Sequence, residues 1–331
     1  MARVAINGLG RIGRAAFKIV LDSPELEIGA VNDLVALDNL AYLLKYDTVY
    51  GRYEKSVEHK DNLLVVDGKE YRVFNEKDPA RLPWRELNID LVFECTGVFT
   101  NQESLEKHIQ AGAKYVILSA PGKGDMPMVV HRINQPEVLP RIISCASCTT
   151  NCITPVVEIM GRHFDVKKAM MTTIHAYTSS QAIVDSPRSK WRRGRAGAAN
   201  FVPTSTGAAK ATTKALPQYE GKFDGVAVRG PVAVGSLADL VFLVGRQTNV
   251  DEVNDVFGKE SRSDRYLGVL GVTDAPLVSS DIIKDPRASV VDLTMTQVVD
   301  GDMVKVMSWY DNEWGYTNQM VREAIDITKM L

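Results

Sequence analysis

Three glycines near the amino terminus constrain the fold of this chain more than any other feature of its sequence. Segment 3–6 has the composition of a short buried strand, and the apolar positions within 15–20 predict a helix soon after it. Between them, Gly8, Gly10 and Gly13 have the spacing G-x-G-x-x-G. Glycines at this spacing permit a tight turn, the close approach of a pyrophosphate, and close packing of helix on strand. The segment therefore predicts the strand–turn–helix start of a dinucleotide-binding domain.

An acidic residue stands where a dinucleotide site needs one. The apolar run 28–31 reads as a second strand, and Asp33 follows it about twenty residues after Gly13. A carboxylate there can hydrogen-bond both ribose hydroxyls of the adenosine half and disfavours a 2′-phosphate. The competing interpretation is that Asp33 caps a turn or a helix, an interpretation that the preceding Asn32 supports. With strand, glycines and acid all in order, the dinucleotide site is favoured.

Further segments continue the pattern of an open α/β sheet. Strand-like runs occupy 73–74, 91–94 and 115–118, and helix-like segments occupy 40–46 and 103–111. The later strands end in small polar residues or glycine, which is where a doubly wound sheet forms its ligand crevice. The first part of the chain is therefore predicted to be a nucleotide-binding α/β domain.

A second distinctive run, S-C-A-S-C-T-T-N-C, covers residues 144–152. It follows the apolar run 139–143 and precedes a segment with helical periodicity, so we expect Cys148 in the first turn of a helix. A thiol there lies at the positive end of the helix dipole, which favours the thiolate. The hydroxyls of Ser147 and Thr149, with the unpaired amides of the helix start, suit an anion or a developing oxyanion.

Two plainer interpretations of this cysteine stay open. Most buried cysteines are inert small hydrophobic residues. Cys145, Cys148 and Cys152 also have the spacing C-x2-C-x3-C, but neither a nearby histidine nor a second cysteine pair supplies the fourth ligand that zinc requires. We therefore expect no metal, and the thiol nucleophile becomes favoured only when other parts of the chain support it.

The second half of the chain has a different pattern. Segment 169–177 alternates like a long strand, and strand-like runs recur at 225–228, 237–244 and 303–309 with few helices between them. This predicts a second domain on an antiparallel or mixed sheet. A polar connector with five basic residues spans roughly 179–203, and an irregular loop of this length in a compact domain is usually functional.

A thiol nucleophile usually needs a base, and the chain has five histidines. His59 and His108 stand in polar segments that predict exposure, and His163 falls late in the helix that Cys148 opens. His175 ends a strand of the second domain, from which it could face the helix start. A structural histidine is commoner than a catalytic one. If His175 does reach Cys148, a thiolate–imidazolium pair would lower the thiol pKa and let the imidazole carry protons.

Composition excludes several classes of protein. The 331 residues suffice for two domains, and a hydrophobic fraction of 45% can bury a full core. A formal net charge of −2 argues against a nucleic-acid partner or an anionic membrane surface, and no apolar run approaches the ~20 residues of a membrane span. The first residues run straight into a strand-like segment rather than a leader. We expect a cytoplasmic protein.

Five motifs follow one another along the chain: N-G-L-G-R-I-G-R at 7–14, S-C-T-T-N at 147–151, H-A-Y-T at 175–178, P-T-S-T-G-A-A-K at 203–210 and W-Y-D-N-E-W-G-Y at 309–316. Together they resemble the phosphorylating glyceraldehyde-3-phosphate dehydrogenases over nearly the whole chain. The resemblance implies an α/β protein with a Rossmann-like NAD(P)-binding domain and an α+β catalytic domain on a mixed or antiparallel sheet. The implied bounds are 1–147, completed by a C-terminal helix over 313–331, for the first domain and 148–312 for the second.

The resemblance also implies a glycolytic activity and a set of site residues. Cys148 would attack the aldehyde of glyceraldehyde 3-phosphate, and His175 would take the hydroxyl proton of the thiohemiacetal as hydride leaves to the nicotinamide. Inorganic phosphate would then release 1,3-bisphosphoglycerate from the thioester. The implied cofactor contacts are Gly8, Gly10, Arg11, Ile12, Gly13, Asp33, Lys77, Ser119 and Asn312. The implied anion contacts are Thr178 and Arg229 for the substrate phosphate, and Ser147, Thr149, Thr206 and Gly207 for the attacking phosphate.

Ordinary structural roles compete with these assignments. Serine and threonine serve more often as caps and turn residues than as ligands, and Asn312 falls in a turn-like segment. The resemblance also implies a homotetramer, because in members of this family the connector reaches across a subunit interface to the cofactor of the neighbouring subunit. Here the loop 186–195 departs from the family pattern, as do Ser180 and Gly230. A basic residue in that loop would suit a 2′-phosphate whereas Asp33 opposes one, so we expect NAD, with NADP or dual use left open.

Three other functions fit part of the pattern. An erythrose-4-phosphate dehydrogenase shares the fold and the nucleophile, but the P-T-S-T-G-A-A-K motif favours the triose enzyme. A semialdehyde dehydrogenase of amino-acid synthesis would need a pocket for a carboxylate or an amino group. A cofactor-binding regulator would use its basic loop rather than its thiol.

Overall fold

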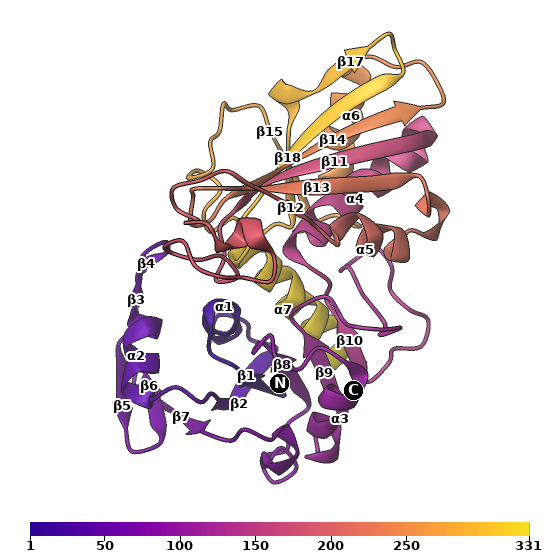
Figure 1. The fold of residues 1–331 in the computed structure, drawn as a ribbon. Coiled ribbons are helices and arrows are strands. Elements are labelled where there is room, and N and C mark those ends of the chain that lie inside the picture. Colours follow the sequence, from indigo (N-terminus) through magenta and orange to yellow (C-terminus); the bar gives the residue numbers. More distant parts are fainter. Residues whose placement is uncertain (331) are drawn as a thin grey trace. The chain divides into compact units, whose positions relative to one another are not determined.

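The computed structural model describes residues 1–330, and these form two compact units (Figure 1). The first unit comprises residues 1–129 and 135–146 together with the chain from Met320 onward. The second unit comprises residues 130–134 and 147–319. The change from one unit to the other after residue 146 falls immediately before the S-C-T-T-N motif at 147–151.

The first unit is built on an eight-stranded sheet in the order β10-β9-β8-β1-β2-β7-β6-β5. Its strands are β1 Ala2–Asn7, β2 Leu26–Asn32, β5 Val57–Lys60, β6 Leu63–Val66, β7 Lys69–Phe74, β8 Leu91–Glu94, β9 Tyr115–Leu118 and β10 Ile142–Ser144. Strands β10 through β7 pair in parallel, whereas β7, β6 and β5 form an antiparallel meander. The remaining elements of this unit are α1 Arg11–Leu21, α2 Leu37–Lys45, β3 Tyr46–Asp47, β4 Gly51–Arg52, the 3-10 turn η1 Pro79–Arg81 and α3 Gln102–Gln110.

The central strands of this sheet are continuous buried runs. All four residues of β8, Leu91–Glu94, are buried, as are the last four of β1. Parallel strands read this way because helices cover both faces of such a sheet. The chain winds outward from β1 on both sides, toward β2 and toward β8, so the polar ends of these strands meet at the switch point where doubly wound folds bind ligands.

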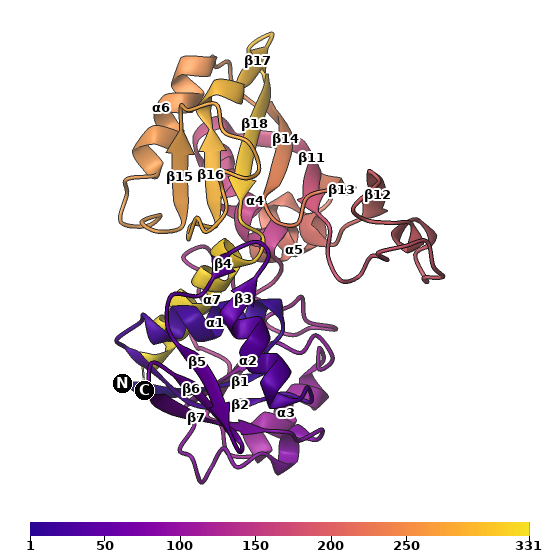
Figure 2. The same cartoon turned by 90° about the vertical axis from the view of Figure 1, so that its left-hand side faces the viewer.

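The second unit is built on a mixed sheet in the order β12-β13-β11-β14-β18-β16-β15, with β17 beside β18 (Figure 2). Its strands are β11 Val166–Ala176, β12 Val202–Ser205, β13 Phe223–Gly230, β14 Ser236–Val244, β15 Leu270–Thr273, β16 Ser289–Asp292, β17 Gln297–Val299 and β18 Met303–Tyr310. Its helices are α4 Cys148–Phe164, α5 Ala208–Ala215 and α6 Val250–Glu260, with 3-10 turns η2 Trp191–Gly194, η3 Pro217–Tyr219 and η4 Leu293–Met295. Helix α7, Trp314–Thr328, begins in this unit and ends in the first.

Alternation along β11 gives this sheet two different faces. Thr173 and His175 are buried on one face, whereas Met170 and Ile174 point to the other and are 67% and 37% exposed. The buried face packs on α4, whose apolar residues Ile153, Val156 and Met160 are fully buried in the same core. The side chains that the sheet presents to α4 therefore come from alternate positions of its central strands.

The predicted fold class is confirmed in both parts of the chain. A doubly wound, mostly parallel sheet forms the first unit, and a mixed sheet forms the second. The predicted connector 179–203 is largely irregular, with η2 and one isolated bridge between Ala182 and Ala196, and it extends away from the sheet (Figure 2). None of the helices within residues 1–330 has the length and hydrophobicity that crossing a membrane would require.

Candidate active site

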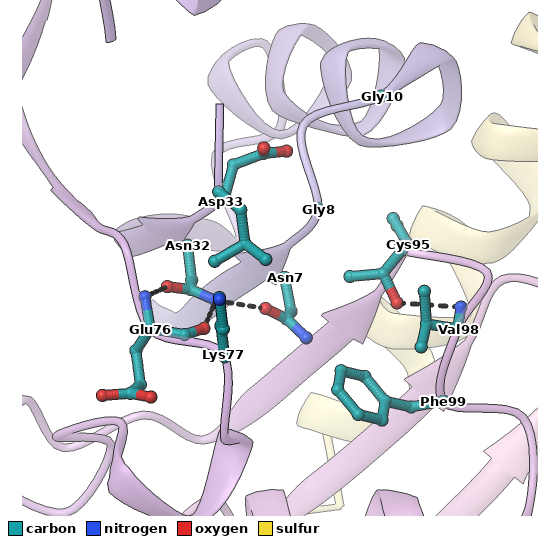
Figure 3. Close-up of a pocket in the computed structure, with 12 residues that line it drawn as sticks. Asn7, Gly8, Gly10, Asn32, Asp33, Glu76, Lys77, Cys95, Val98 and Phe99 are labelled. Atoms are coloured by element: carbon teal, nitrogen blue, oxygen red, sulfur yellow. Dashed lines mark hydrogen bonds between the residues drawn. The ribbon is translucent and has the colours of Figure 1, made fainter. Parts of the chain in front are cut away.

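The first unit contains a pocket of about 490 Å³ where β1, β2 and β8 end (Figure 3). Its lining includes Gly8, Gly10, Asp33 and Lys77, all four of which the sequence assigned to a cofactor site. Thr96, which follows β8, completes the opposite wall. The pocket therefore lies in the crevice that the strand order of a doubly wound sheet predicts.

Two of the three glycines are required by steric fit. A Cβ at Gly13 would lie 1.9 Å from the carbonyl oxygen of Gly8, so α1 could not pack against the loop. Gly8 itself has a φ of +93°, and a Cβ there would lie 2.7 Å from the backbone nitrogen of Thr96. A Cβ at Gly10, in contrast, would have no neighbouring atom within 4 Å. The loop thus packs tightly on its protein side and is open at Gly10, as a bound pyrophosphate requires.

Asp33 fixes the glycine loop at the end of β2. One carboxylate oxygen accepts the backbone N–H of Leu9 at 2.6 Å, and the other accepts that of Val35 at 2.9 Å. The capping role considered for this residue is therefore real. A carboxylate has about four acceptor positions, so two such bonds leave capacity for the hydroxyls of a ribose.

A polar network joins the strands that line the pocket. The carboxylate of Glu94, which is fully buried, accepts hydrogen bonds from Asn7 Nδ2 at 2.6 Å and from the backbone N–H of Thr96 at 2.8 Å. Asn32 donates to Asn7 Oδ1 at 2.7 Å and to the carbonyl of Glu76, and the Glu76 N–H donates back to Asn32 (Figure 3). These bonds tie β1, β2 and β8 together, and Asn7, Asn32 and Glu76 themselves line the pocket.

The predicted exposure of His108 is wrong. Its side chain is fully buried, with Nε2 at 3.1 Å from Glu94 and Nδ1 accepting from Trp84 Nε1 at 3.0 Å. The prediction failed because most residues of α3 are polar and face outward, whereas His108 lies on the buried side of this helix with Leu105 and Ile109. His59, by contrast, is exposed on the edge strand β5, as predicted.

Arg11 and Ile12 begin α1, immediately after Gly10. The guanidinium of Arg11 forms an ion pair with Asp47 and lies 5.4 Å from the ring centre of Tyr50. Hydrogen bonds from Tyr50 and Val49 and the charge of Arg11 outweigh burial and lower the pKa of Asp47. The first turn of α1 is therefore anchored by a carboxylate that the sequence analysis did not identify.

The other predicted cofactor residues of the first unit lie around the same pocket. Lys77 is part of its lining. Ser119 follows β9 and hydrogen-bonds the thiol of Cys95, which also lines the pocket. Burial raises the pKa of Cys95 to about 12, so this thiol is an inert part of the wall.

In the second unit, α4 begins at Cys148 as predicted. Ser147 is the N-cap, and its Oγ accepts the backbone N–H of Thr150 at 3.1 Å. The structural role weighed for Ser147 is therefore present. Residues 153–164 supply the apolar face that holds α4 on the sheet, and Pro155 in the helix interior does not end it. The sulfur thus stands at the amino end of a helix that is fixed along its length.

The sulfur of Cys148 lies 3.3 Å from Nε2 of His175, so the predicted nucleophile and base are in hydrogen-bond contact. His175 is near the end of β11 and pairs in register with Arg229 on the parallel strand β13. Nη1 of Arg229 contacts Nδ1 of His175 and donates to the carbonyl of Ala176 at 2.9 Å. A guanidinium, an imidazole and a thiol therefore form a row.

The expected thiolate–imidazolium pair is not what this environment favours. Burial raises the pKa of Cys148, and the opposing effects of Arg229, the Thr149 hydroxyl and the backbone amides of Thr149 and Cys148 do not outweigh it. Burial and the positive charge of Arg229 lower the pKa of His175 to about 3. The free protein therefore favours a neutral thiol beside a neutral imidazole, because both charged forms lose their hydration. The helix amides act in the predicted direction but are the smaller effect.

The predicted anion ligands of the second unit lie at the ends of its elements. Thr178 follows β11, and its hydroxyl lies 2.8 Å from Ser180 Oγ. Thr206 and Gly207 lie at the amino end of α5, where the Thr206 hydroxyl accepts the N–H of Ala208 at 3.2 Å. Helix α5 packs on α4, and each of these hydroxyls already has one local partner. Their roles toward phosphate remain proposals.

Asn312 follows β18 and is held by the start of β14. Its Oδ1 accepts from Ser236 Oγ at 2.9 Å and from the backbone N–H of Gly235 at 3.2 Å. The side chain is buried and oriented rather than placed on an open turn. The turn interpretation considered for Asn312 is therefore insufficient for this residue.

Several site residues escaped the sequence analysis. Tyr310, at the end of β18, lies with its hydroxyl between Thr149 and Thr173. Tyr310 belongs to the motif W-Y-D-N-E-W-G-Y at 309–316, but the motif alone does not reveal which residues its hydroxyl contacts. Glu94 could have been identified from the sequence, because it is a charged residue at the end of an otherwise apolar strand. Nothing local marks Asp47, because its partner Arg11 is distant in sequence.

Among residues 1–330, no group of three or more His, Cys, Asp or Glu side chains is arranged to hold a metal ion. A dinucleotide pocket in one unit and a thiol in contact with a buried imidazole in the other are features of a nicotinamide-dependent oxidoreductase.

Comparison with known proteins identifies the family. Residues 2–102 match the family described as glyceraldehyde 3-phosphate dehydrogenase, NAD binding domain, and residues 147–312 match the corresponding C-terminal domain. The chain is 49% identical to glyceraldehyde-3-phosphate dehydrogenase of Thermotoga maritima, covering 100% of each chain. It is 48% identical to glyceraldehyde-3-phosphate dehydrogenase 2 of Streptomyces avermitilis over 99% of each. The chain belongs to the glyceraldehyde-3-phosphate dehydrogenase family, and it is an NAD-dependent oxidoreductase.

Proposed function

We propose that this chain oxidises and phosphorylates glyceraldehyde 3-phosphate to 1,3-bisphosphoglycerate, with Cys148 as nucleophile and His175 as base. The observation that carries this proposal is the 3.3 Å contact between the Cys148 sulfur and His175 Nε2 at the amino end of α4. Bound NAD supplies the hydride acceptor. A neutral imidazole is the form that can accept a proton, so the low pKa of His175 keeps the base ready for use at neutral pH.

The proton steps follow from the neutral pair. As the sulfur attacks the aldehyde carbon, His175 takes the thiol proton and delivers it to the carbonyl oxygen, which gives a thiohemiacetal on Cys148. When hydride leaves the same carbon, His175 takes the hydroxyl proton and a thioester remains. Phosphate attacks the thioester and the carbon–sulfur bond breaks. The departing thiolate regains a proton from His175, while the proton of the phosphate goes to solvent.

Two anion sites are needed, and the contacts around the thiol support their assignment. We assign the substrate phosphate to Thr178 and Arg229. Nε of Arg229 is buried without a hydrogen-bond partner among the described residues, although its Nη1 is engaged. A buried guanidinium N–H left unpaired is costly, so an anion there would complete its hydrogen bonds. Ser147, Thr149, Thr206 and Gly207 are assigned to the attacking phosphate, since two helix starts favour an anion.

The decisive variant is Cys148→Ser, with Cys152→Ser as its matched control on the same helix. We expect the first to lose at least about 1,000-fold of dehydrogenase turnover, because a serine hydroxyl is a far weaker nucleophile next to a neutral imidazole. The control cysteine is fully buried and contacts Ser289 and Ser308, so that variant should stay active. Turnover is measured with NAD and inorganic phosphate, and a trapped acyl group is located by peptide mass spectrometry. Substantial turnover in Cys148→Ser would exclude the covalent mechanism.

The same assays separate the neighbouring functions. Phosphate-dependent turnover on the triose, in parallel with erythrose 4-phosphate, distinguishes the two sugar dehydrogenases and excludes an amino-acid semialdehyde enzyme. A non-enzymatic regulator would keep its main activity after loss of the thiol. Asp33 beside Gly10 supports NAD, and NADP or dual use is tested by exchanging the cofactor. The family identity disfavours all three alternatives.

We also propose that the chain works as a homotetramer in the cytoplasm. The outer face of the second unit's sheet supports the oligomer, because it leaves Met170, Val226 and Met303 67%, 53% and 49% exposed.

A further inference from the structure

A tyrosine hydroxyl connects the first turn of α4 to the sheet beside the candidate nucleophile. Tyr310 is only 1% exposed, and its oxygen lies 2.9 Å from Oγ1 of Thr149 and 2.8 Å from Oγ1 of Thr173. Thr149 follows Cys148 directly. Thr173 precedes His175 by two positions on β11, so both point to the same face of the sheet. The contacts of one oxygen therefore reach the helix and the strand that carry the reactive pair.

The number of hydrogens available to the three hydroxyls determines which of them donates and which accepts in each contact. Each of the three hydroxyls has one hydrogen to donate. Thr149 directly follows Cys148, and its hydroxyl lowers the pKa of the thiol, as a hydrogen-bond donor to the sulfur does; a thiolate can only accept. The hydroxyl of Thr173 also lies 3.4 Å from the carbonyl of Leu237, so its one hydrogen is shared, and the shorter contact, at 2.8 Å, is with Tyr310. When the sulfur is ionised, the arrangement that keeps the short contacts runs one way. Thr173 donates to Tyr310, Tyr310 donates to Thr149, and Thr149 donates to the sulfur.

We propose that Tyr310 is a positioning residue whose hydroxyl, held by Thr173, orients the Thr149 hydroxyl as a donor to the sulfur of Cys148. This inference rests on the proposed role of Cys148 as nucleophile, and no assigned catalytic or phosphate role includes Tyr310 or Thr173.

The ring of Tyr310 contributes to a different contact. It meets the imidazole of His175 edge to face, with the ring centres 6.0 Å apart. Phenylalanine would keep that packing and remove only the oxygen. Burial raises the pKa of Tyr310, so its hydroxyl stays protonated and able to donate throughout the range in which the thiol ionises.

The groups facing the sulfur determine the direction of the expected effect. Within the second unit they are His175 from β11, Arg229 from β13, Tyr310 from β18 and Cys152 from α4. Burial raises the pKa of the Cys148 thiol, and the Thr149 hydroxyl is one of the few groups that lower it. Without Tyr310 to orient it, that hydroxyl can rotate away from the sulfur. The thiol would then ionise at a higher pH.

The test is the pH dependence of thiol alkylation in the full-length protein, with iodoacetamide as the probe and peptide mass spectrometry to follow Cys148. In Tyr310→Phe we expect the inflection to rise by about half a pH unit to one unit, which is the effect of one hydrogen bond to a charged group. At neutral pH the alkylation rate should fall about threefold to tenfold. Thr173→Val should shift the profile in the same direction by less.

Tyr266→Phe is the matched control. Tyr266 is equally buried in the same unit, and its hydroxyl donates to Glu158 in the second half of α4, ten residues after Cys148. It should leave the alkylation profile unchanged while losing the same oxygen. The double variant Tyr310→Phe/Thr173→Val should be no worse than Tyr310→Phe alone, because both changes interrupt one path.

Two results would overturn the inference: an unchanged profile in folded Tyr310→Phe, or full additivity of the two changes. If Tyr310→Phe does not fold, an unchanged profile in Thr173→Val overturns it instead. Because alkylation needs no substrate, this outcome is independent of whether Cys148→Ser abolishes turnover.

Discussion

At the scale of single residues, burial decides the charge state of the reactive pair. The helix start and Arg229 both favour a thiolate, yet the sulfur and the imidazole lose more by being removed from water. The pair of Cys148 and His175 is therefore stored in its neutral form. In the proposed mechanism the thiol gives its proton to the base as the sulfur attacks, so proton transfer and attack on the carbonyl are coupled.

The low pKa of His175 predicts a specific pH dependence of stability. The folded-state pKa of about 3 lies below the ordinary value of 6.5, so the native state binds this proton less readily than the unfolded state does. The stabilisation is present above pH 6.5 and is lost as the pH falls toward 3. From pH 7.5 to pH 5 the contribution of His175 should fall by about 2 kcal/mol.

The measurement is urea unfolding of the wild type and of His175→Asn at equal protein concentration across this pH range. Asparagine does not titrate, so the difference in unfolding free energy between the two proteins should decrease by that amount toward acid. A difference that stays constant from pH 7.5 to pH 5 would contradict the assigned environment of the imidazole.

At the scale of elements, two glycines of the same loop have different roles: Gly13 is needed for packing, and Gly10 faces the pocket. A Cβ at Gly13 would overlap the carbonyl of Gly8, so Gly13→Ala should lower the free energy of unfolding by about 1–3 kcal/mol and weaken NAD binding. Gly10→Ala is the matched control, because no atom lies within 4 Å of the added carbon. It should change stability by less than about 1 kcal/mol and still weaken NAD binding, since Gly10 lines the pocket.

Urea unfolding and isothermal titration with NAD give the two readouts. Equal losses of stability in both variants would show that Gly13 has no special packing role. Undiminished NAD affinity in Gly10→Ala would place the pyrophosphate elsewhere.

Elements with a strong local pattern were predictable from the sequence. Strands β8, β11 and β18 were found as buried or alternating runs, and α4 was found from its apolar period. The hairpin of β5 and β6 was missed, because an edge strand such as Val57–Lys60 is mostly exposed and carries charged residues. Helix α6 was missed as well: it buries only Val253 and Phe257, too few positions to reveal a helical period.

At the scale of the whole molecule, contacts between distant segments were the part that sequence patterns did not reveal. Glu94 meets Asn7 across 87 positions, and Tyr310 meets Thr149 across 161 positions. Hydrogen bonds of this kind leave no period in the sequence, because each residue only has to be polar at one buried position. The cysteine run and the glycine loop were recognisable because their chemistry is concentrated in short motifs.

The exposed face of the second unit's sheet is the expected site of assembly between copies of the chain. Met170 lies near the middle of that face, opposite Val241 of β14 and two positions before Thr172, which pairs with Val226 of β13. Apolar residues gathered on one sheet face usually meet a partner, and in the proposed oligomer that partner is a second copy of this chain. A lysine at position 170 would bring like charges together across a two-fold interface at the cost of their hydration.

Met170→Lys should therefore lower the mass of the particle in sedimentation velocity, from about four times the 36.5 kDa of one chain to a smaller oligomer at micromolar concentration. Met330→Lys is the matched control, since this methionine is 63% exposed at the far end of the chain, against 67% for Met170. The control should sediment as the wild type does. Because Met170 points away from the face that carries His175, the alkylation rate of Cys148 should stay within about twofold of the wild type in either variant. An unchanged sedimentation coefficient for Met170→Lys would mean that the sheet face is not the interface, whatever the size of the wild-type particle.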